Sequence, residues 1–550
     1  MTNEAIRQKV ETLLTQMTLE EKAAQMVQVP YTVVGREESL RWAKLGAGSF
    51  LHVLGDDARE IQQAALHESR LGIPVIFGID AIHGHGLKHE ATIFPSQLAA
   101  ACSWDPAIVE EMGRVTAREV ASDGLHWTFS PVCCLGRDTR WGRIDETFGE
   151  DPYLSGEMTY GIVKGYQGES LDAPDSILAC AKHYIGYGEA MGARDAMDTQ
   201  MTYRKMKEVF LPPFKRAVDA GCATFMTAYG SIDGHSFTAD PKTMKTILRD
   251  ELGFDGFVVT DWNNCESLMT QQFVAASMED AAVQSAEAGN DMIMSTLGFY
   301  EAAISAVKSG KMAESVLDEA VRHILTVKFR MNLFGKPEKE GVPGCIGCQE
   351  HRDAALRAAR RRASSELTAR IGEELRFLDM PRVHFDVRLS PLEGKEPYRA
   401  DGGDDVEFLI STNPGEPPLP MIRIASGGEL SRIMLAIKSV LSGADGVPTL
   451  IFDEVDTGVS GKTSRKIGIK LKTIARGAQV LCVTHSAQIV SLADHHYYIY
   501  KEEVAGRTET RVRELAGEER VEEIARILGG MQVTDAQRES ARELMKESWE

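Results

Sequence analysis

The sequence predicts an α/β protein, in which a (β/α)8 barrel of the TIM type precedes a partial α/β lobe that handles nucleotides. Over the first 335 residues, short apolar runs alternate with longer amphipathic stretches. Buried parallel strands separated by helices produce this pattern. From about residue 363 the chain changes character and carries glycine-rich and acidic motifs typical of phosphate-handling proteins.

Eight apolar runs are the strand candidates of the barrel. They are residues 25–30, 46–51, 74–81, 127–132, 177–186, 224–230, 257–262 and 291–294. Helical patterns lie between them, for example at 107–122, 203–220 and 277–288. About eight such units in this length indicate a TIM-type barrel. Asp80, Lys182, His183, Tyr229 and Asp261 fall at the carboxyl ends of these strands, where catalysis takes place in such barrels.

The chain divides into three predicted parts: a barrel over 1–335, a junction over 336–362 and a second lobe over 363–550. The junction starts as a loop (336–350) and continues into an Arg-rich helix expected over 351–380. The second lobe should contain β-runs at 383–389 and 406–412, a Pro-rich loop at 414–420, a βαβ alternation through 500 and an exposed charged helix at 515–548.

Composition narrows the possible functions. A chain of 550 residues with 43% hydrophobic and 26% charged residues fits a soluble protein with more than one domain. The net charge of −20 argues against broad nonspecific nucleic-acid binding, and leaves open direct DNA contact through a local patch. The first residues contain no apolar core of a signal peptide, and no run approaches the ~18 apolar residues of a membrane span. Cys345 and Cys348 form one CxxC pair, but no second pair follows at zinc-ribbon spacing. These features predict a cytoplasmic protein without a membrane partner.

Five motifs in the first part resemble one known family. They are "MTLEEKAAQM" (17–26), "GIDAIHG" (78–84), "RDTRWGRIDETFGEDPYL" (137–154), "AKHYIGYG" (181–188) and "FDGFVVTDWNN" (254–264). Together they resemble the barrel domain of glycoside hydrolase family 3, the β-glucosidase type. The resemblance implies a retaining glycoside hydrolase that acts on a β-glucoside or a small oligosaccharide and needs no cofactor.

The resemblance also implies roles for single residues. Asp261 matches the family's nucleophile, which suits a carboxylate delivered by a strand to the pocket. The residues that match positions holding the nonreducing-end sugar are Asp80, Arg143, Lys182 and His183, and the plausible aromatic walls are Tyr229 and Trp262. Each residue alone has a plainer interpretation: Asp80 as a helix cap, Lys182 in a structural ion pair and Trp262 as core.

The general acid/base is unassigned. Most of the family places this glutamate in a second α/β sandwich domain after the barrel, but the family resemblance stops after "GCQEHRDAALRAARR" (347–361). Some members place a His/Asp pair on a barrel loop instead. The corresponding segment contains Asp195 and Asp198 without the histidine pattern. Loss of general acid help costs about 10²–10⁴ in rate, so we expect impaired hydrolysis.

From about residue 363 the chain resembles the C-terminal part of the RecN DNA-repair ATPase, a relative of SMC and ABC proteins. The matching segments are 375–387, "SGGELSR" (426–432), "TLIFDEVDTGVSG" (449–461) and "VTHSAQI" (483–489). The resemblance implies that Ser426, Gly427, Gly428 and Glu429 meet a partner's nucleotide at a helix N-terminus. It also implies that Asp453 organises Mg²⁺, Glu454 positions water, Asp456 begins an interface loop and His485 senses the γ-phosphate.

This lobe contains no GxxxxGK[ST] loop, which would supply the phosphate-binding lysine. The nearest imitation, "DTGVSGKTS" (456–464), starts with Asp456 and follows the acidic strand, so we interpret Lys462 as a surface residue. The sequence therefore predicts no autonomous ATPase activity. ATP and Mg²⁺ are expected only together with a RecN-like partner chain.

Three hypotheses remain open. The barrel could be a weakened glycoside hydrolase with a passenger lobe, and this is the function that we favour because the barrel holds the nucleophile. The second lobe could instead act in trans with an intact RecN-like protein. The chain could also be a non-functional fusion joined within the Arg/Ala-rich stretch near residue 360.

Overall fold

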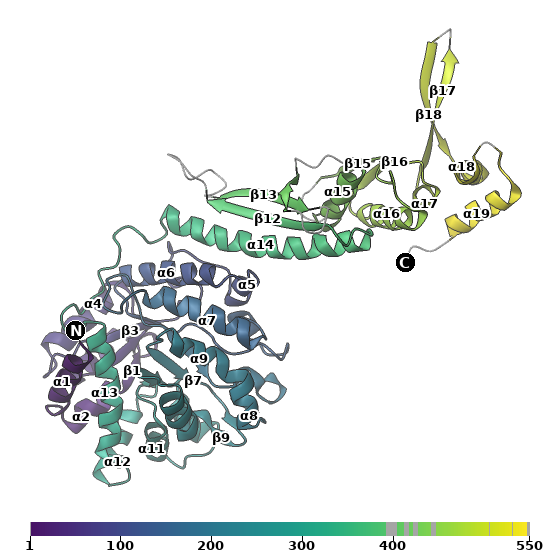
Figure 1. Cartoon of the computed structure of the whole chain (residues 1–550). Helices are drawn as coiled ribbons and strands as arrows, with labels where there is room; N and C mark the ends of the chain where they lie inside the picture. The colour runs from purple at the N-terminus through teal and green to yellow at the C-terminus, as the bar shows by residue number, and fades with distance from the viewer. Residues whose placement is uncertain are drawn as a thin grey trace. The chain divides into compact units, whose positions relative to one another are not determined.

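The computed structural model describes residues 2–391, 404–411, 417–421, 427–441, 447–504, 507–530 and 532–546. The chain folds into two compact units, Met1–Arg362 and Ala363–Glu550. In the first unit a central ring of strands is surrounded by helices (Figure 1), so the predicted TIM-type barrel is confirmed.

Eight parallel strands form the barrel. One sheet has the order β11-β1-β2-β3-β4 and a second the order β10-β7-β5. Parallel bridges between Val132 and Lys182 and between Val259 and Met292 close the ring. The strands are β1 (Val27–Pro30), β2 (Ser49–Leu51), β3 (Ile76–Ile79), β4 (Trp127–Thr128), β5 (Cys180–Tyr184), β7 (Thr224–Thr227), β10 (Phe257–Val259) and β11 (Ile293–Met294). All eight predicted runs contain one of these strands, because each run is apolar enough to be buried on both faces.

Helices precede the first barrel strand, connect successive strands and follow the last one. They are α1 (Asn3–Leu14), α2 (Leu19–Gln25), α3 (Tyr31–Leu45), α4 (Gly55–His67), α5 (Gln97–Ala101), α6 (Pro106–Ser122), α7 (Pro152–Gln167), α8 (Tyr203–Lys205), α9 (Leu211–Asp219), α10 (Asn264–Thr270), α11 (Met278–Ala288), α12 (Phe299–Lys308) and α13 (Glu314–Arg330). Two π-helical stretches, Met206–Phe210 and Lys242–Glu251, complete the layer. A small sheet of β6 (Asp198–Thr199), β8 (Ser231–Ile232) and β9 (His235–Ser236) lies in the loops.

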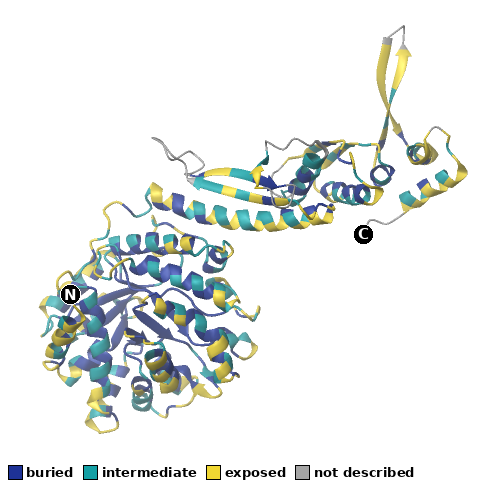
Figure 2. Cartoon of the chain, in the orientation of Figure 1, coloured by how far each residue is buried: buried dark blue, intermediate teal, exposed yellow. Residues whose placement is uncertain are grey.

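Large aromatic side chains fill the barrel interior. The Trp127 ring packs edge-on against Phe129 and Phe257, with ring centroids 4.5 and 5.1 Å apart. Gly78 on the neighbouring strand makes room for them, because a Cβ atom there would lie 2.5 Å from the Phe129 ring. The strands are accordingly buried throughout, whereas the helices are exposed on their outer sides (Figure 2).

The junction segment is fixed to the barrel by buried polar groups. The Pro337 carbonyl accepts hydrogen bonds from Gln62 Nε2 at 2.7 Å and His126 Nε2 at 3.0 Å. Lys339 Nζ donates to the carbonyls of Leu171 and Ala173 at 2.9 and 2.8 Å. The strap, as we call residues 336–351, is therefore an integral part of the first unit.

A buried carboxylate on α6 anchors the far end of the strap. Glu119 accepts hydrogen bonds from the Gly347 N–H at 2.9 Å, the Thr92 N–H at 2.7 Å and, at 2.8 Å, from His351 Nδ1. Burial opposes its charge, but these donors lower the pKa of Glu119 below its usual value. The carboxylate therefore links the loop after β3 to the strap.

One helix, α14 (Gln349–Phe377), contributes to both units. Ala354 and Ala358 belong to the core of the first unit, and Ile371 and Leu375 to the core of the second. The Arg-rich helix expected over 351–380 is thus confirmed. The functional division at residues 335 and 362 stays a prediction.

The described residues of the second unit form three small sheets. Its strands are β12 (His384–Pro391), β13 (Asp404–Ser411), β14 (Leu419–Pro420), β15 (Thr449–Asp453), β16 (Gln479–Val483), β17 (His496–Val504) and β18 (Arg507–Leu515). Its helices are α15 (Gly427–Leu441), α16 (Gly461–Ile474), α17 (Ala487–Val490), α18 (Gly517–Gly529) and α19 (Asp535–Lys546). β15 and β16 pair in parallel, which confirms the βαβ alternation, and β12, β13 and β14 are antiparallel.

The single charged helix predicted for 515–548 is wrong. The chain forms two helices there, α18 and α19, which share a small core of Val521, Ile524, Ala525 and Ala541. The apolar residues of both helices are spaced so that they meet in this core. The many charged residues around them hide this spacing in the sequence. In the described part of the chain, none of the helices is both long and apolar enough to cross a membrane.

Candidate functional site

Four barrel strands deliver polar side chains to the same end of the barrel. His52 follows β2, Asp80 follows β3, Lys182 and His183 end β5, and Asp261 follows β10. All these strands are parallel, so their carboxyl ends lie together. The structure thus brings the predicted residues into one site. It adds His52, which the sequence analysis did not assign to the site.

Asp261 is a largely buried carboxylate, 8% exposed. Its Oδ1 accepts a hydrogen bond of 2.6 Å from the Trp262 N–H. Its Oδ2 meets no hydrogen-bond donor among the described residues, and the nearest basic atom is His183 Nε2 at 3.5 Å. One oxygen is therefore held by the backbone while the other is free to react.

Burial sets the protonation of Asp261. Loss of hydration raises the pKa of this carboxyl to about 6, although the Lys182 and Arg143 charges and the Trp262 N–H oppose the shift. The nearby Asp80 charge raises the pKa further. At neutral pH the group is mostly ionised, as a nucleophile requires.

Asp80 is clamped on both of its oxygens. Lys182 Nζ donates to Oδ1 at 2.9 Å, and His52 Nε2 lies 3.0 Å from Oδ2. Burial alone would raise the pKa of Asp80, but the Lys182 charge and the hydrogen bonds from His52 and Lys182 hold it well below its usual value. The Asp80 side chain remains 39% exposed, so an ionised carboxylate faces open space.

An irregularity in β5 lets neighbouring residues serve one pocket. Side chains of adjacent strand residues normally point to opposite faces. The register of β5 against β7 shifts between Ala181 and Tyr184, and such shifts re-aim side chains. As a result Lys182 reaches Asp80 while His183 faces Asp261.

His183 is neutral in this site. Burial and the Arg143 and Lys182 charges lower its pKa well below the usual value. Its backbone N–H donates to Cys134 Sγ at 3.2 Å, and its ring lies 4.9 Å from that of Tyr187. The ring is thus fixed beside Asp261 without adding a charge.

Arg143 reaches the site from the loop after β4. Its guanidinium forms two hydrogen bonds with Glu146, at 2.7 and 2.8 Å. Burial opposes its charge, but Glu146 raises the pKa of Arg143 above the usual value. Arg143 Nη1 also lies 3.4 Å from the Tyr187 hydroxyl, which places a fixed cation next to His183.

The two predicted aromatic walls lie near Asp261. The Tyr229 hydroxyl donates to the Trp262 carbonyl at 2.5 Å, and burial, followed by the Asp261 charge, raises the pKa of Tyr229. Trp262 is 40% exposed, so its plainer interpretation as a core residue is wrong. Contact of either ring with a sugar stays a prediction.

Asp195 and Asp198 occupy different environments. Asp198 Oδ1 accepts hydrogen bonds from Ser231 Oγ at 2.6 Å and from the Gly234 N–H at 2.9 Å, so it braces the small sheet. Asp195 accepts a hydrogen bond from the Tyr187 hydroxyl. Of the two, only Asp195 is linked to a residue that contacts His183.

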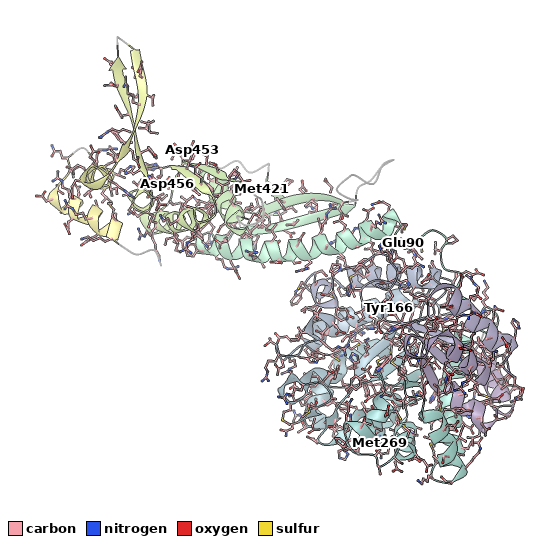
Figure 3. The ribbon with its side chains drawn as sticks, turned by 180° about the vertical axis from the view of Figure 1, so that it is seen from behind. Glu90, Tyr166, Met269, Met421, Asp453 and Asp456 are labelled. Carbon is pink, nitrogen blue, oxygen red and sulfur yellow. The ribbon has the colours of Figure 1, made fainter. Side chains whose placement is uncertain are left out.

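Four of the predicted nucleotide residues, Asp453, Glu454, Asp456 and His485, lie at or near the end of β15 in the second unit. Asp453 ends this strand, and Asp456 follows in the next turn (Figure 3). Asp456 is buried and accepts a hydrogen bond of 2.7 Å from Thr484 Oγ1, and its expected place at the start of an interface loop stays a prediction. His485 Nδ1 lies 3.8 Å from Asp456 Oδ2.

The remaining predicted nucleotide residues are only partly described. Gly427 and Gly428 open α15, as expected for a signature at a helix start, and Glu429 lies in its first turn. Ser426 lies outside the described residues. Glu454, next to Asp453, has a left-handed backbone (φ 47°) and is exposed, and Lys462 is exposed as expected.

The fold and this constellation define the class of protein: a TIM barrel with a buried carboxylate among charged groups at the carboxyl ends of its strands. Residues 18–327 match the model of the glycosyl hydrolase family 3 N terminal domain. The chain belongs to this family.

Curated relatives fall into two groups. The periplasmic β-glucosidase of Salmonella typhimurium is 35% identical over 371 residues, which cover 66% of this chain and 48% of that protein. The DNA repair protein RecN of Halalkalibacterium halodurans is 50% identical over 197 residues, or 36% of this chain and 35% of that protein. The chain thus spans about half the length of the first relative and about a third of the second.

Solved structures agree with the first group. A β-glucosidase involved in saponin metabolism from intestinal bacteria superposes with a TM-score of 0.62 at 31% identity, covering 86% of this chain and 69% of that one. The β-glucosidase of Listeria innocua in complex with glucose gives 0.61 at 26% identity with the same coverage. Both predicted resemblances are therefore confirmed.

Sequence reasoning missed three residues that shape the site: His52, Glu146 and Tyr187. His52 directly follows a predicted strand, so the rule that found Asp80 could have found it. Glu146 follows Arg143 by three residues within a quoted motif. Tyr187 also lies within a quoted motif, "AKHYIGYG", but its contacts depend on the conformation of the loop after β5.

Proposed function

We propose that the barrel is a retaining glycoside hydrolase that removes terminal β-D-glucosyl residues. The observation that carries this proposal is the free Oδ2 of Asp261, placed at the carboxyl end of the barrel beside Asp80, Lys182, His183 and Arg143. Asp80, Lys182 and Arg143 offer charged hydrogen-bond partners, which suit sugar hydroxyls because such bonds are stronger than neutral ones.

The chemistry follows from the two oxygens of Asp261. Oδ2 attacks the anomeric carbon, the bond to the leaving oxygen breaks, and the departing group takes the electron pair. Oδ1 stays bound to the Trp262 N–H, which stabilises the carboxylate orientation. Water then attacks the anomeric carbon, loses a proton to solvent or to a base, and releases Asp261. No cofactor enters these steps.

The first test isolates the nucleophile. A 2-deoxy-2-fluoroglucoside with a dinitrophenolate leaving group needs no enzymic acid, so it reports on Asp261 alone. We expect the intact mass to increase by one fluoroglucosyl group and peptide mapping to place that group on Asp261. Asp261→Ala should not be labelled, while Asp56→Asn, a change at an exposed carboxylate on α4, should label as the parent does. Absence of labelling in folded protein would overturn the proposal.

The second test addresses the acid/base. If the chain lacks this group, the rate of glucoside cleavage should depend steeply on the acidity of the leaving phenol, with a loss of about 10²–10⁴ for poor leaving groups. Asp195→Asn distinguishes the alternative. An unchanged dependence in this variant supports an absent acid/base, whereas a large selective loss on poor leaving groups would assign the role to Asp195.

A second candidate function concerns the second unit, because the RecN relative is 50% identical over 197 residues. We propose that this unit binds ATP with Mg²⁺ only together with a RecN-like partner chain. Asp453 is an exposed carboxylate at a strand end, which suits a Mg²⁺ ligand, but the sequence has no phosphate-binding loop. Fluorescent-ATP titration should show no binding by the chain alone, and more ATP bound by a mixture of the chain with an intact RecN than by that RecN alone. Binding by the chain alone would contradict this, and a mixture that binds no more ATP than RecN alone would favour the fusion hypothesis.

A further inference from the structure

We propose that His52 is a positioning residue for Asp80, and that it thereby determines which sugar epimers the site accepts. The inference rests on the proposed function and adds a specificity residue to it. The motifs that identified the other site residues do not include His52, which lies between 46–51 and 78–84.

His52 is held in place by its backbone. The residue directly follows β2 and adopts a left-handed conformation with φ 59°, which is uncommon for a residue with a side chain. Its N–H donates to the Gly78 carbonyl at 2.9 Å. Leu51 pairs with Gly78 in the β2–β3 register, so His52 lies beside the end of β3, from which Asp80 extends.

Two hydrogen-bond partners fix the orientation of the Asp80 carboxylate, which one partner cannot do. An ammonium group acts as a compact point charge on a flexible stem, so Lys182 alone leaves the Asp80 carboxylate free to rotate about its Cβ–Cγ bond. His52 engages the other oxygen at 3.0 Å. With a partner on each oxygen, the plane of the carboxylate is defined relative to the barrel.

This orientation determines what Asp80 can still accept. An ionised carboxylate has about four acceptor positions, two on each oxygen. Lys182 and His52 each occupy one, which leaves one acceptor position on each oxygen. The side chain is 39% exposed, so these positions are open to a ligand. The geometry suits two hydroxyl groups of one sugar, and an epimer at either carbon would leave one of the two positions unpaired.

The test compares specificity rather than rate. Initial rates are measured on dinitrophenyl β-glucoside, its C4 epimer the galactoside and its C2 epimer the mannoside. We expect His52→Leu to reduce at least one glucoside-to-epimer ratio of kcat/KM by about tenfold, because the carboxylate can then turn to meet the epimer. His52→Asn retains a donor and should restore the ratio to within about threefold of the parent.

A control variant and a substitute variant make the outcome decisive. His67→Leu, at an exposed histidine on α4, should leave every ratio unchanged. If His52→Leu does not fold, His52→Ala removes the donor without adding bulk and takes its place. Equal losses on all three substrates would show a merely structural role and overturn the inference, while the proposed function stands. A parent chain that neither turns over these substrates nor is labelled by the fluoroglucoside overturns both.

Discussion

His183 Nε2 lies 3.5 Å from Asp261 Oδ2, the one carboxylate oxygen of the site that meets no donor in the described part of the chain. Because burial keeps His183 neutral, this neighbour does not pair with the charge of Asp261. The carboxylate is thus less stabilised than Asp80, which has two donors. The two acids of one pocket therefore differ in protonation behaviour, as expected where environments assign separate roles.

The pH dependence of catalysis should report this difference. Asp261 must be ionised to attack, and its pKa is about 6, so kcat/KM for a dinitrophenyl glucoside should fall tenfold per pH unit below about pH 6. Above about pH 6 we expect kcat/KM to level off. Stopped assays between pH 4.5 and 8 measure this dependence, and a constant rate down to pH 4.5 would contradict the burial of this carboxylate.

Replacing Asp261 by Asn should stabilise the first unit while abolishing labelling. The folded pKa of Asp261 is above its unfolded value of 3.8, so the folded protein binds more protons between about pH 4 and 6. Stability therefore falls as pH rises through this window. At pH 7 we expect a gain of about 1–3 kcal/mol in the variant, measured by denaturant unfolding. The gain should disappear near pH 4, and an equal gain at both values would exclude the ionisation as its cause.

Lys328, which is not one of the candidate-site residues, provides a second test of how burial shifts a pKa. Its side chain is fully buried on α13, and Nζ donates to Gln25 Oε1 at 3.0 Å. Burial lowers its pKa to about 7, so the folded protein binds fewer protons than the unfolded chain between about pH 7 and 10. Stability should rise with pH across this window.

Lys328→Met should remove that dependence. We expect the variant to be more stable by about 1–4 kcal/mol at pH 7, with a smaller gain at pH 9, in thermal or urea unfolding of the first unit. Lys308→Met, at an exposed lysine paired with Glu20, is the matched control and should change stability by less than about 1 kcal/mol at either pH. A greater gain at pH 9 than at pH 7 would reverse the predicted sign.

Truncation should reveal the role of the strap. A fragment ending at residue 335 leaves Gln62, His126 and Glu119 without partners that the strap supplies. Buried polar groups without partners cost about 1–3 kcal/mol each. We expect fragment 1–335 to aggregate and fragment 1–362 to remain folded and labelled by the fluoroglucoside. Size-exclusion chromatography separates these outcomes, and a monomeric, labelled 1–335 would show that the strap is dispensable.

The barrel could be predicted from the sequence because its strands are buried on both faces and stand out as apolar runs. Asp80, Lys182, His183 and Asp261 could be predicted because each falls at the end of such a run. His52 also follows such a run, so its place at the carboxyl end of the barrel could have been predicted, but its contact with Asp80 depends on the β2–β3 register. That register is a long-range property, and a strand of three residues carries no sign of it in its own sequence.

In the second unit, too, long-range contacts could not be predicted from the local sequence. The charged tail hides two packed helices, because Val521, Ile524 and Ala541 are few among many charges. The buried state of Asp456 depends on Thr484, which lies 28 residues away in the chain. The sequence predicts only a plain loop for the strap, because its stability comes from partners on α4, α6 and the loop before β5 rather than from its own composition.

The register shift in β5 has a consequence for redesign. Lys182 and His183 are joined by one peptide bond, yet the first contacts Asp80 and the second lies beside Asp261. A backbone change in β5 therefore moves partners of both carboxylates at once. Libraries aimed at new sugars should vary the loop after β2, where a change at His52 acts on Asp80 and leaves the 3.5 Å contact of His183 with Asp261 in place.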